Sequence, residues 1–216
     1  MTDYNIISFP RSGQHLTEKV LKVICSYFNQ RYSYCEFYNC CRTIPCKKKY
    51  RFMKNHDFNL NYLINSKNKY IVLYRTDFIH QLESWFRLKY HSIKPFNYRE
   101  NFMLYNNLLK FIKSNMNYRK SFINKWVHNQ TNNKNCISID YDEIIKSPQD
   151  YLKKLLTFME LKHDDRDCSN ILSLVGDIKY LNRLPFDLYK KIIVDLNIQQ
   201  EKVLDKRFLS NKWKLF

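Results

Sequence analysis

Glycine is scarce in this chain of 216 residues, with only Gly13 and Gly176 present and far apart. A G-x-G-x-x-G dinucleotide-binding loop needs three closely spaced glycines, and a G-x-x-x-x-G-K-[ST] phosphate-binding loop needs two. Neither loop can exist here, so a phosphate-binding loop in this chain must be of another type. A nucleoside or nucleotide kinase built on the second loop is disfavoured on the same ground.

Apolar runs and helical spacings alternate along the chain, which is typical of an α/β fold. The pattern predicts strands at 5–9, 51–54, 70–74 and 136–140. It predicts helices at about 15–28, from 78 onward, within 100–128, and at 148–160, 165–175 and 185–204. This order predicts three α/β/α layers around a central, mainly parallel sheet. The length fits one domain over residues 1–216.

The charge balance favours anionic partners. There are 37 Lys and Arg against 20 Asp and Glu, a formal net charge of +17. Nucleic acid, phosphorylated cofactors, acidic glycans and an anionic membrane face all suit such a chain. No apolar run approaches the length of a transmembrane helix, and the N-terminus lacks the features of a signal peptide. We therefore expect a soluble cytoplasmic protein whose seven cysteines are mainly thiols.

The turn between the first predicted strand and helix, Ser8–Gly13, has the chemistry of an anion site. In a parallel α/β fold this turn lies at the carboxyl edge of the sheet, and the following helix adds partial positive charge. Arg11 can contact phosphate or sulfate oxygens with two N–H groups, and Ser12 adds a hydroxyl donor. An ordinary β–α turn with a surface arginine is the alternative.

Ser8–Gly13 resembles the phosphosulfate-binding loop of the sulfotransferases that use PAPS (3′-phosphoadenosine 5′-phosphosulfate). In that family the first strand ends in a Tyr/Phe-Pro-Lys/Arg-Ser-Gly turn, which is P-loop-like. The resemblance implies that the 5′-phosphosulfate is held by Arg11, Ser12, Gly13, Gln14 and His15.

Lys54-Asn55-His56 is similar to the Lys-x-His segment after the second strand of many of these enzymes. There the histidine is the catalytic base, and a neutral imidazole suits removal of a hydroxyl proton near pH 7. The resemblance implies His56 as general base, with Lys54 and Arg11 offsetting charge on the transferring group. If His56 is displaced, Asp57 or Glu83 could substitute.

Two later segments also follow the family's order. A strand ending at Arg75, then a helix carrying Ser84, resembles the site that grips the ribose 3′-phosphate. The segment Asp140-Tyr141-Asp142-Glu143 resembles a stretch whose tyrosine can lie near the adenine, so Tyr141 is a candidate adenine neighbour. Helix-start chemistry at Ser147-Pro148 would also explain part of this segment.

Together the matches cover roughly residues 5–160 and imply a PAPS-dependent sulfotransferase. The acceptor would be a hydroxyl, with a carbohydrate favoured, and adenosine 3′,5′-bisphosphate would leave without help from a metal. A basic nucleic-acid-binding protein and a nucleotide-binding relative without activity are the alternatives. The cysteines at 35, 40, 41 and 46 lack the Cys-x2-Cys spacing of a zinc knuckle, so thiols are favoured over a zinc site.

Overall fold

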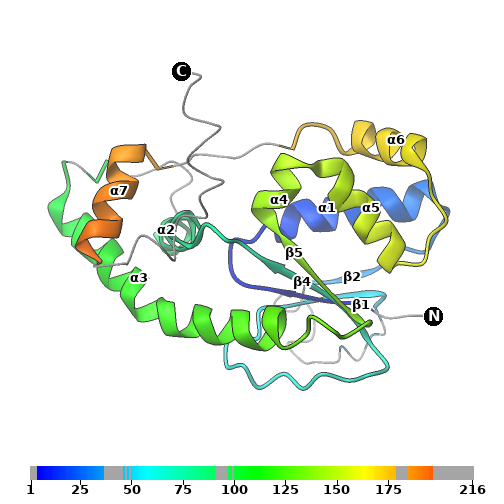
Figure 1. Ribbon diagram of the computed structural model, residues 1–216, viewed down its shortest axis with the longest axis horizontal. Helices are drawn as coiled ribbons and strands as arrows, with labels where there is room; N and C mark the ends of the chain where they lie inside the picture. The colour runs from blue at the N-terminus through cyan, green and yellow to red at the C-terminus, as the bar shows by residue number, and fades with distance from the viewer. Residues whose placement is uncertain are drawn as a thin grey trace. The chain divides into compact units, whose positions relative to one another are not determined.

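The computed structural model describes residues 4–36, 46, 48, 50–90, 97–98, 100–178 and 184–196 (Figure 1). The chain divides into two compact units. The first unit comprises residues 1–76 and 118–180, and the second comprises 77–117 and 181–216. A single domain over 1–216 stays a prediction.

The first unit is built on a five-stranded sheet whose described pairings are all parallel. In the order β2-β3-β1-β4-β5 the strands are Tyr34–Cys35, Phe52–Asn55, Tyr4–Ser8, Lys69–Tyr74 and Cys136–Asp140. β1 is central, with Ile7 opposite Asn55 of β3 and Val72 of β4. The apolar run of β4 is explained by burial on both faces of the sheet.

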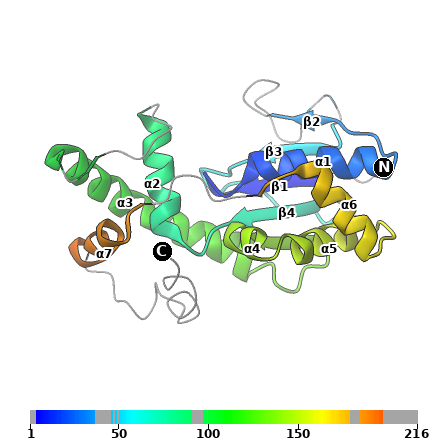
Figure 2. The ribbon, with the colours of Figure 1, turned by 90° about the horizontal axis from the view of Figure 1, so that it is seen from above.

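Helices cover both faces of this sheet, as the edge-on view of Figure 1 and the view onto one face in Figure 2 show together. One face packs against α1 (Gln14–Tyr27), α4 (Tyr141–Lys146), α5 (Pro148–Phe158) and α6 (Asp165–Val175). The other face meets the end of α3 (Phe102–Ile123) and the π-helical turn η1 (Asn124–His128) that continues it. Alternation along β4 serves both layers: Ile71 and Leu73 join the first core, and the Tyr70 ring lies 5.7 Å from the Trp126 ring. The predicted α/β/α layers are therefore confirmed.

The second unit contains α2 (Phe78–Lys89), the start of α3, and α7 (Phe186–Asp195). Its core is aromatic. The ring of Phe111 on α3 lies 5.3 Å from that of Trp85 and 5.5 Å from that of Phe86, both on α2. This packing explains why aromatic residues are dense in this part of the sequence.

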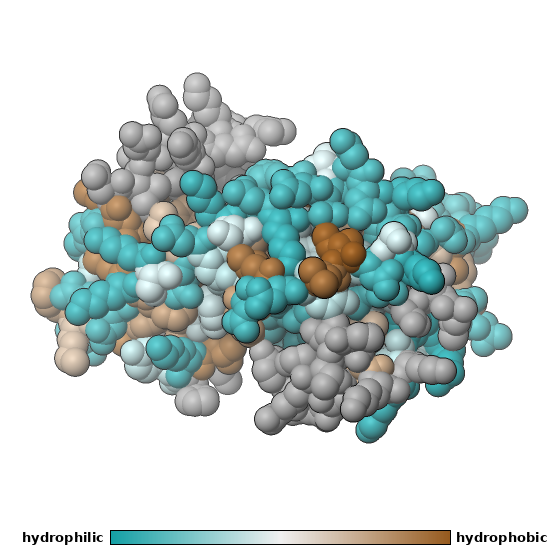
Figure 3. All heavy atoms as spheres, turned by 90° about the horizontal axis from the view of Figure 1, so that it is seen from below, coloured by the Kyte–Doolittle hydropathy of each residue, from teal (hydrophilic) through white to brown (hydrophobic). Residues whose placement is uncertain are grey.

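The element boundaries follow the sequence pattern closely. The helix predicted at 185–204 is observed as α7, which ends at Asp195, and residues 197–204 lie outside the described residues. The short β2 and α4 were not predicted. Among the described residues, none of the helices combines the length and apolar character needed to span a membrane. The face drawn in Figure 3 is mainly hydrophilic, with small separate hydrophobic groups.

Candidate active site

The loop between β1 and α1 turns sharply at the carboxyl edge of the sheet. The Phe9 N–H donates to the Leu73 carbonyl at 3.0 Å, which extends the β1–β4 ladder by one residue. Arg11 and Gly13 then adopt left-handed backbone conformations, with φ of 66° and 81°. Arg11 is exposed, whereas Ser12 is fully buried. A non-glycine residue at positive φ is unfavourable and is typical of constrained functional loops.

The start of α1 has the properties of an anion site. Gly13 caps the helix without a side-chain hydrogen bond, and the first turn of this fully described helix contains no acidic residue. The first N–H groups of a helix lack partners within it and carry partial positive charge. The first turn of α1 has no carboxylate to neutralise that charge, so the helix start can bind phosphate or sulfate oxygens.

Gln14 and His15, at the start of α1, differ in their surroundings. The Gln14 side chain is buried: its Oε1 accepts from the Ser8 hydroxyl at 2.9 Å, and its Nε2 donates to Tyr34 Oη at 3.5 Å. The His15 side chain is 79% exposed, with Nδ1 3.9 Å from a Glu18 carboxylate oxygen. Gln14 therefore holds the loop in place, while His15 faces solvent beside it.

His56 follows β3 and lies next to the end of β1. Its Nδ1 is 2.8 Å from the carbonyl oxygen of Ser8 and 3.1 Å from the Ser8 hydroxyl. A carbonyl oxygen can only accept a hydrogen bond, so Nδ1 carries the hydrogen of the neutral ring. The lone pair is then on Nε2, which is the nitrogen that can take a proton from another group.

The surroundings of His56 keep its ring neutral. Burial lowers the pKa of His56 to about 4 from its ordinary value near 6.5. The bond to the Ser8 carbonyl acts in the opposite direction, and the positive charge of Lys54 lowers the pKa further. At pH 7 the imidazole is therefore in the form that accepts a proton.

Lys54 lies on β3, two residues before His56, and its side chain is only 10% exposed. Its ammonium forms an ion pair with Glu36 at 2.9 Å. Glu36 also belongs to the one group of possible metal ligands found among the described residues, in which donor atoms of His15, Glu18 and Glu36 lie within 4.8 Å of one another. Glu36 is already held by Lys54, and the absence of a metal stays a prediction.

Tyr141 lies against Gly13 of the loop and against Arg75. A Cβ atom at Gly13 would stand 2.1 Å from Cδ2 of Tyr141, so only glycine leaves room for this ring. The Arg75 guanidinium lies over the Tyr141 ring, 5.0 Å from its centre. Its Nη2 also donates to an Asp142 carboxylate oxygen at 3.2 Å.

The supporting carboxylates of this region were missed from the sequence. Asp140 caps α4 by accepting from the Asp142 N–H at 2.9 Å, and it also accepts from the N–H and hydroxyl of Thr76. Arg119 donates to the Arg75 carbonyl at 2.6 Å. An acidic cap three residues before Glu143 is a recognisable helix-start pattern, and it could have revealed Asp140.

The remaining candidates, Glu83 and Ser84, belong to the second unit. Ser84 is on α2 of the second unit, and Arg75 belongs to the first. Glu83 is 1% exposed, lies 2.8 Å from Arg87 and accepts from Tyr98 at 3.0 Å. Burial raises the pKa of Glu83, and its bonds give it a packing role in that unit.

The cysteine segment is described only in part. Cys35 and Cys46 are buried against Met53, whereas residues 40 and 41 lie outside the described residues.

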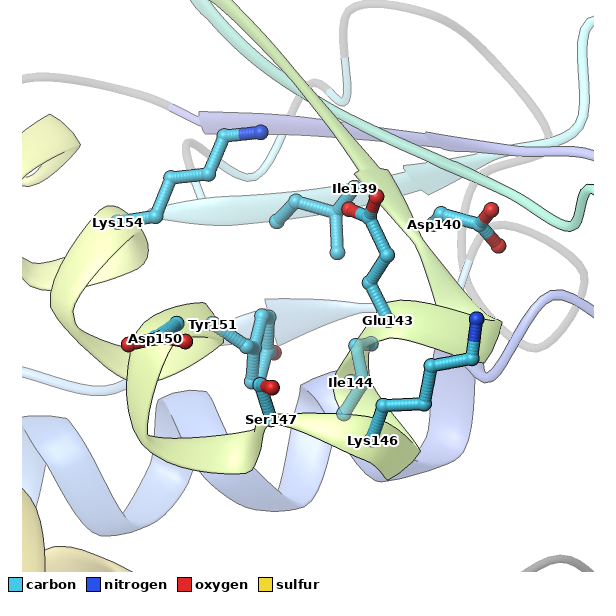
Figure 4. Close-up of a pocket in the computed structure, with 9 residues that line it drawn as sticks. All are labelled: Ile139, Asp140, Glu143, Ile144, Lys146, Ser147, Asp150, Tyr151 and Lys154. Carbon is cyan, nitrogen blue, oxygen red and sulfur yellow. The ribbon is translucent and has the colours of Figure 1, made fainter. Parts of the chain in front are cut away.

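A cavity of about 350 Å³ lies beside β5, α4 and α5 (Figure 4). Its lining mixes basic and acidic side chains: Asp140, Glu143, Lys146, Asp150 and Lys154. The Lys154 ammonium donates to the Ser138 carbonyl at 2.6 Å, on the open edge of β5. Strands β1 and β4 separate this cavity from β3 and His56, and Asp140 is a residue that the cavity shares with the region of Arg75 and Tyr141.

Comparison with known proteins identifies the fold. No family model and no curated protein sequence matches the chain. The crystal structure of mouse sulfotransferase SULT7A1 complexed with PAP matches with a TM-score of 0.59 and 20% identity, covering 81% of this chain and 64% of that one. A sulfotransferase from Alicyclobacillus acidocaldarius matches with a TM-score of 0.47 and 10% identity, covering 94% of each chain. The chain spans less than two thirds of the mouse protein, and that likeness shows the fold.

Proposed function

We propose that this chain, which has the sulfotransferase fold, transfers a sulfuryl group from PAPS to an acceptor hydroxyl with His56 as general base. The observation that carries the proposal is the 2.8 Å contact between His56 Nδ1 and the Ser8 carbonyl. It joins the base directly to the residue from which the anion-binding loop starts. It also leaves Nε2 as the proton acceptor.

The loop residues fit the phosphosulfate group of PAPS. The start of α1, which has no side-chain cap, and the Ser12 hydroxyl are the proposed donors, and the left-handed turn at Gly13 joins them in one loop. Arg11 and the backbone of Gln14 and His15 complete the proposed phosphosulfate site. When bound, PAPS supplies the sulfuryl group and leaves as adenosine 3′,5′-bisphosphate.

The chain's own chemistry in this proposal is proton transfer and charge stabilisation. Nε2 of His56 takes the proton of the acceptor hydroxyl as its oxygen attacks sulfur in line. Arg11 and Lys54 stabilise negative charge that develops on the sulfuryl oxygens and the leaving phosphate. These two cations take the part that Mg²⁺ has in phosphoryl transfer, so we propose a reaction without a metal.

The nucleotide half of the site is proposed to include Arg75 for the 3′-phosphate and Tyr141 near the adenine. Their mutual contact at 5.0 Å, and the contact of Tyr141 with Gly13, support this assignment. Ser84 is proposed as a further 3′-phosphate ligand from the sequence resemblance. The net charge of +17 suits an acidic acceptor, and we favour a carbohydrate hydroxyl. A cytoplasmic location is proposed from the sequence alone.

The first test is calorimetric titration with adenosine 3′,5′-bisphosphate, against AMP and ATP, at near-physiological salt. Tight binding that depends on the 3′-phosphate is expected, followed by turnover with labelled PAPS and hydroxyl acceptors. Equal weak binding of all three nucleotides would contradict the site and favour a basic surface that binds nucleic acid. Selective binding without turnover on any acceptor would favour an inactive relative.

The second test replaces the base. His56→Ala should abolish turnover and leave the affinity for adenosine 3′,5′-bisphosphate within a few-fold of the parent chain. His163→Ala is the matched control, because His163 lies between α5 and α6 and bonds the Leu161 carbonyl at 2.8 Å. Full activity of His56→Ala would refute the assignment of the base.

A further inference from the structure

Asp57, the residue after His56, is the centre of a buried cluster that the proposed chemistry does not use. Its side chain is buried, with the residue 6% exposed. Oδ2 accepts from the Lys125 ammonium at 2.7 Å and from the Trp126 indole N–H at 2.8 Å. Oδ1 accepts from the Tyr62 N–H at 2.9 Å. We call these four residues the Asp57 cluster.

Lys125 ties the segment after His56 to η1. Besides Asp57, its ammonium donates to the carbonyls of Leu60 at 2.8 Å and Tyr62 at 2.7 Å. An ammonium has three hydrogens, and these three acceptors can use all of them. Trp126, the next residue, is fully buried against Tyr62, with ring centres 6.0 Å apart. A π-helical turn is rare and is frequently found at functional sites.

The backbone held by this cluster is strained. Asp57 has a φ of 46° and Leu60 a φ of 54°, both in the left-handed region. Non-glycine residues adopt this region only when surrounding contacts impose it, and such residues gather at active sites. The Leu60 N–H donates to the Asp57 carbonyl at 2.9 Å, which closes the turn. The cluster is therefore what keeps the chain in this conformation directly after His56.

His56 is fixed from its other sides as well. Its backbone carbonyl accepts from the Tyr118 hydroxyl at 2.9 Å. The Tyr118 ring stacks on Phe9 of the anion-binding loop, with centres 5.1 Å apart. The imidazole is bonded to Ser8 and lies 5.2 Å from the Phe58 ring. The backbone of His56 is thus held by Tyr118 and by Asp57, the next residue, and its ring is held by Ser8.

We propose that Asp57 is a positioning residue, and that its cluster holds His56 with Nδ1 on the Ser8 carbonyl and Nε2 presented as the proton acceptor. Asp57 is then not a substitute base, because both of its oxygens are already bound within the protein. The catalytic consequence rests on the proposed function. The placement of the His56 ring does not depend on the proposed function, because it can be measured in the absence of any substrate.

The pKa of His56 can distinguish a positioning role of Asp57 from a purely electrostatic effect of its charge. Lys54 on β3, Glu36 after β2 and His15 on α1 act on its ring. Asp57→Asn removes a negative charge and leaves the Lys125 ammonium, so electrostatics alone would lower the pKa of His56 further. Release of the ring to water would instead raise that pKa toward its ordinary value near 6.5. The two explanations predict opposite directions.

The experiment is an NMR titration of the His56 ring nitrogens in the full chain, without ligand. In the parent chain we expect the Nδ1–H form and a midpoint near pH 4. In Asp57→Asn we expect the midpoint to rise by about one unit or more, with both N–H forms populated. An unchanged or lower midpoint with the Nδ1–H form retained would overturn the proposal. Asp167→Asn is the matched control, since its carboxylate bonds Tyr27 and the Asp164 backbone on α6.

A milder variant and a kinetic measurement complete the test. Trp126→Phe removes one donor to Asp57 while keeping an aromatic ring, and it should raise the midpoint by a smaller amount even if Asp57→Asn does not fold. With PAPS and an acceptor, Asp57→Asn should lower kcat roughly 10- to 100-fold with little change in KM. Unchanged kcat in a folded Asp57→Asn would also overturn the proposal. Lack of turnover in the parent chain would refute the proposed function, while the titration would still decide the positioning of His56.

Discussion

Replacement of Gly13 by alanine tests the packing between the anion-binding loop and Tyr141. The new Cβ would stand 2.1 Å from Cδ2 and 2.6 Å from Cε2 of Tyr141. Tyr141 is also covered by the Arg75 guanidinium, so its ring cannot move without disturbing that contact. A left-handed backbone costs an alanine about 1–2 kcal/mol, and overpacking costs about 1–3 kcal/mol more. Gly13→Ala should therefore lower the free energy of unfolding by about 2–5 kcal/mol.

A double-mutant cycle separates these two contributions. In a Tyr141→Ala background the clash is gone, and Gly13→Ala should cost only the backbone part, about 1–2 kcal/mol. Urea unfolding gives the four free energies, and titration with adenosine 3′,5′-bisphosphate reports the accompanying loss of affinity. Gly176→Ala is the control, because Gly176 has a φ of 76° but no atom within 4 Å of its added Cβ. Equal costs of Gly13→Ala in both backgrounds would refute the packing argument.

Three further outcomes are expected. Because the pKa of His56 is lowered to about 4 from near 6.5, its contribution to stability is complete above pH 6.5 and is lost as the pH falls toward 4. The loss is at most about 3 kcal/mol, and His56→Gln should flatten this part of the urea-unfolding profile; an equally steep profile would contradict the shift. Lys54→Met should lower kcat about 100-fold in a steady-state assay, and an unchanged kcat would show that Glu36 already neutralises its charge. Arg75→Lys removes the planar fork that meets Tyr141 and Asp142, so calorimetry should show about tenfold weaker binding of adenosine 3′,5′-bisphosphate with AMP binding unchanged.

The sequence pattern was most informative where burial is periodic or continuous. The run at 70–74 predicted β4, and the spacing from His15 to Phe28 predicted α1 almost to its ends. The two-residue β2 was missed, because Tyr34 and Cys35 are too few to show a period. The six-residue α4 was missed because one and a half turns give no helical stripe.

The sequence indicated which strand ends carry the candidate residues, but it did not indicate which side chains contact them. Parallel strands place their carboxyl ends at one edge, so His56 and Arg75 were expected near the loop. The side chains that hold the candidate residues in place are distant from them in the sequence. Nothing local indicates that Tyr141 packs on Gly13, or that Lys125 and Trp126 converge on Asp57. Trp126 is fully buried, yet its indole N–H has a polar partner in Asp57.

The strand order also has a consequence for how the protein is made. β4 lies between β1 and β5, but β5 at Cys136–Asp140 leaves the ribosome long after β4 at Lys69–Tyr74. Until then one side of β4 has no partner strand, although Tyr70 to Leu73 are fully buried in the finished sheet. Exposed apolar strand edges of this kind promote aggregation, and pairing across a long stretch of chain is slow. Synthesis of this chain should therefore depend on chaperone protection of β4 until residue 140 has emerged.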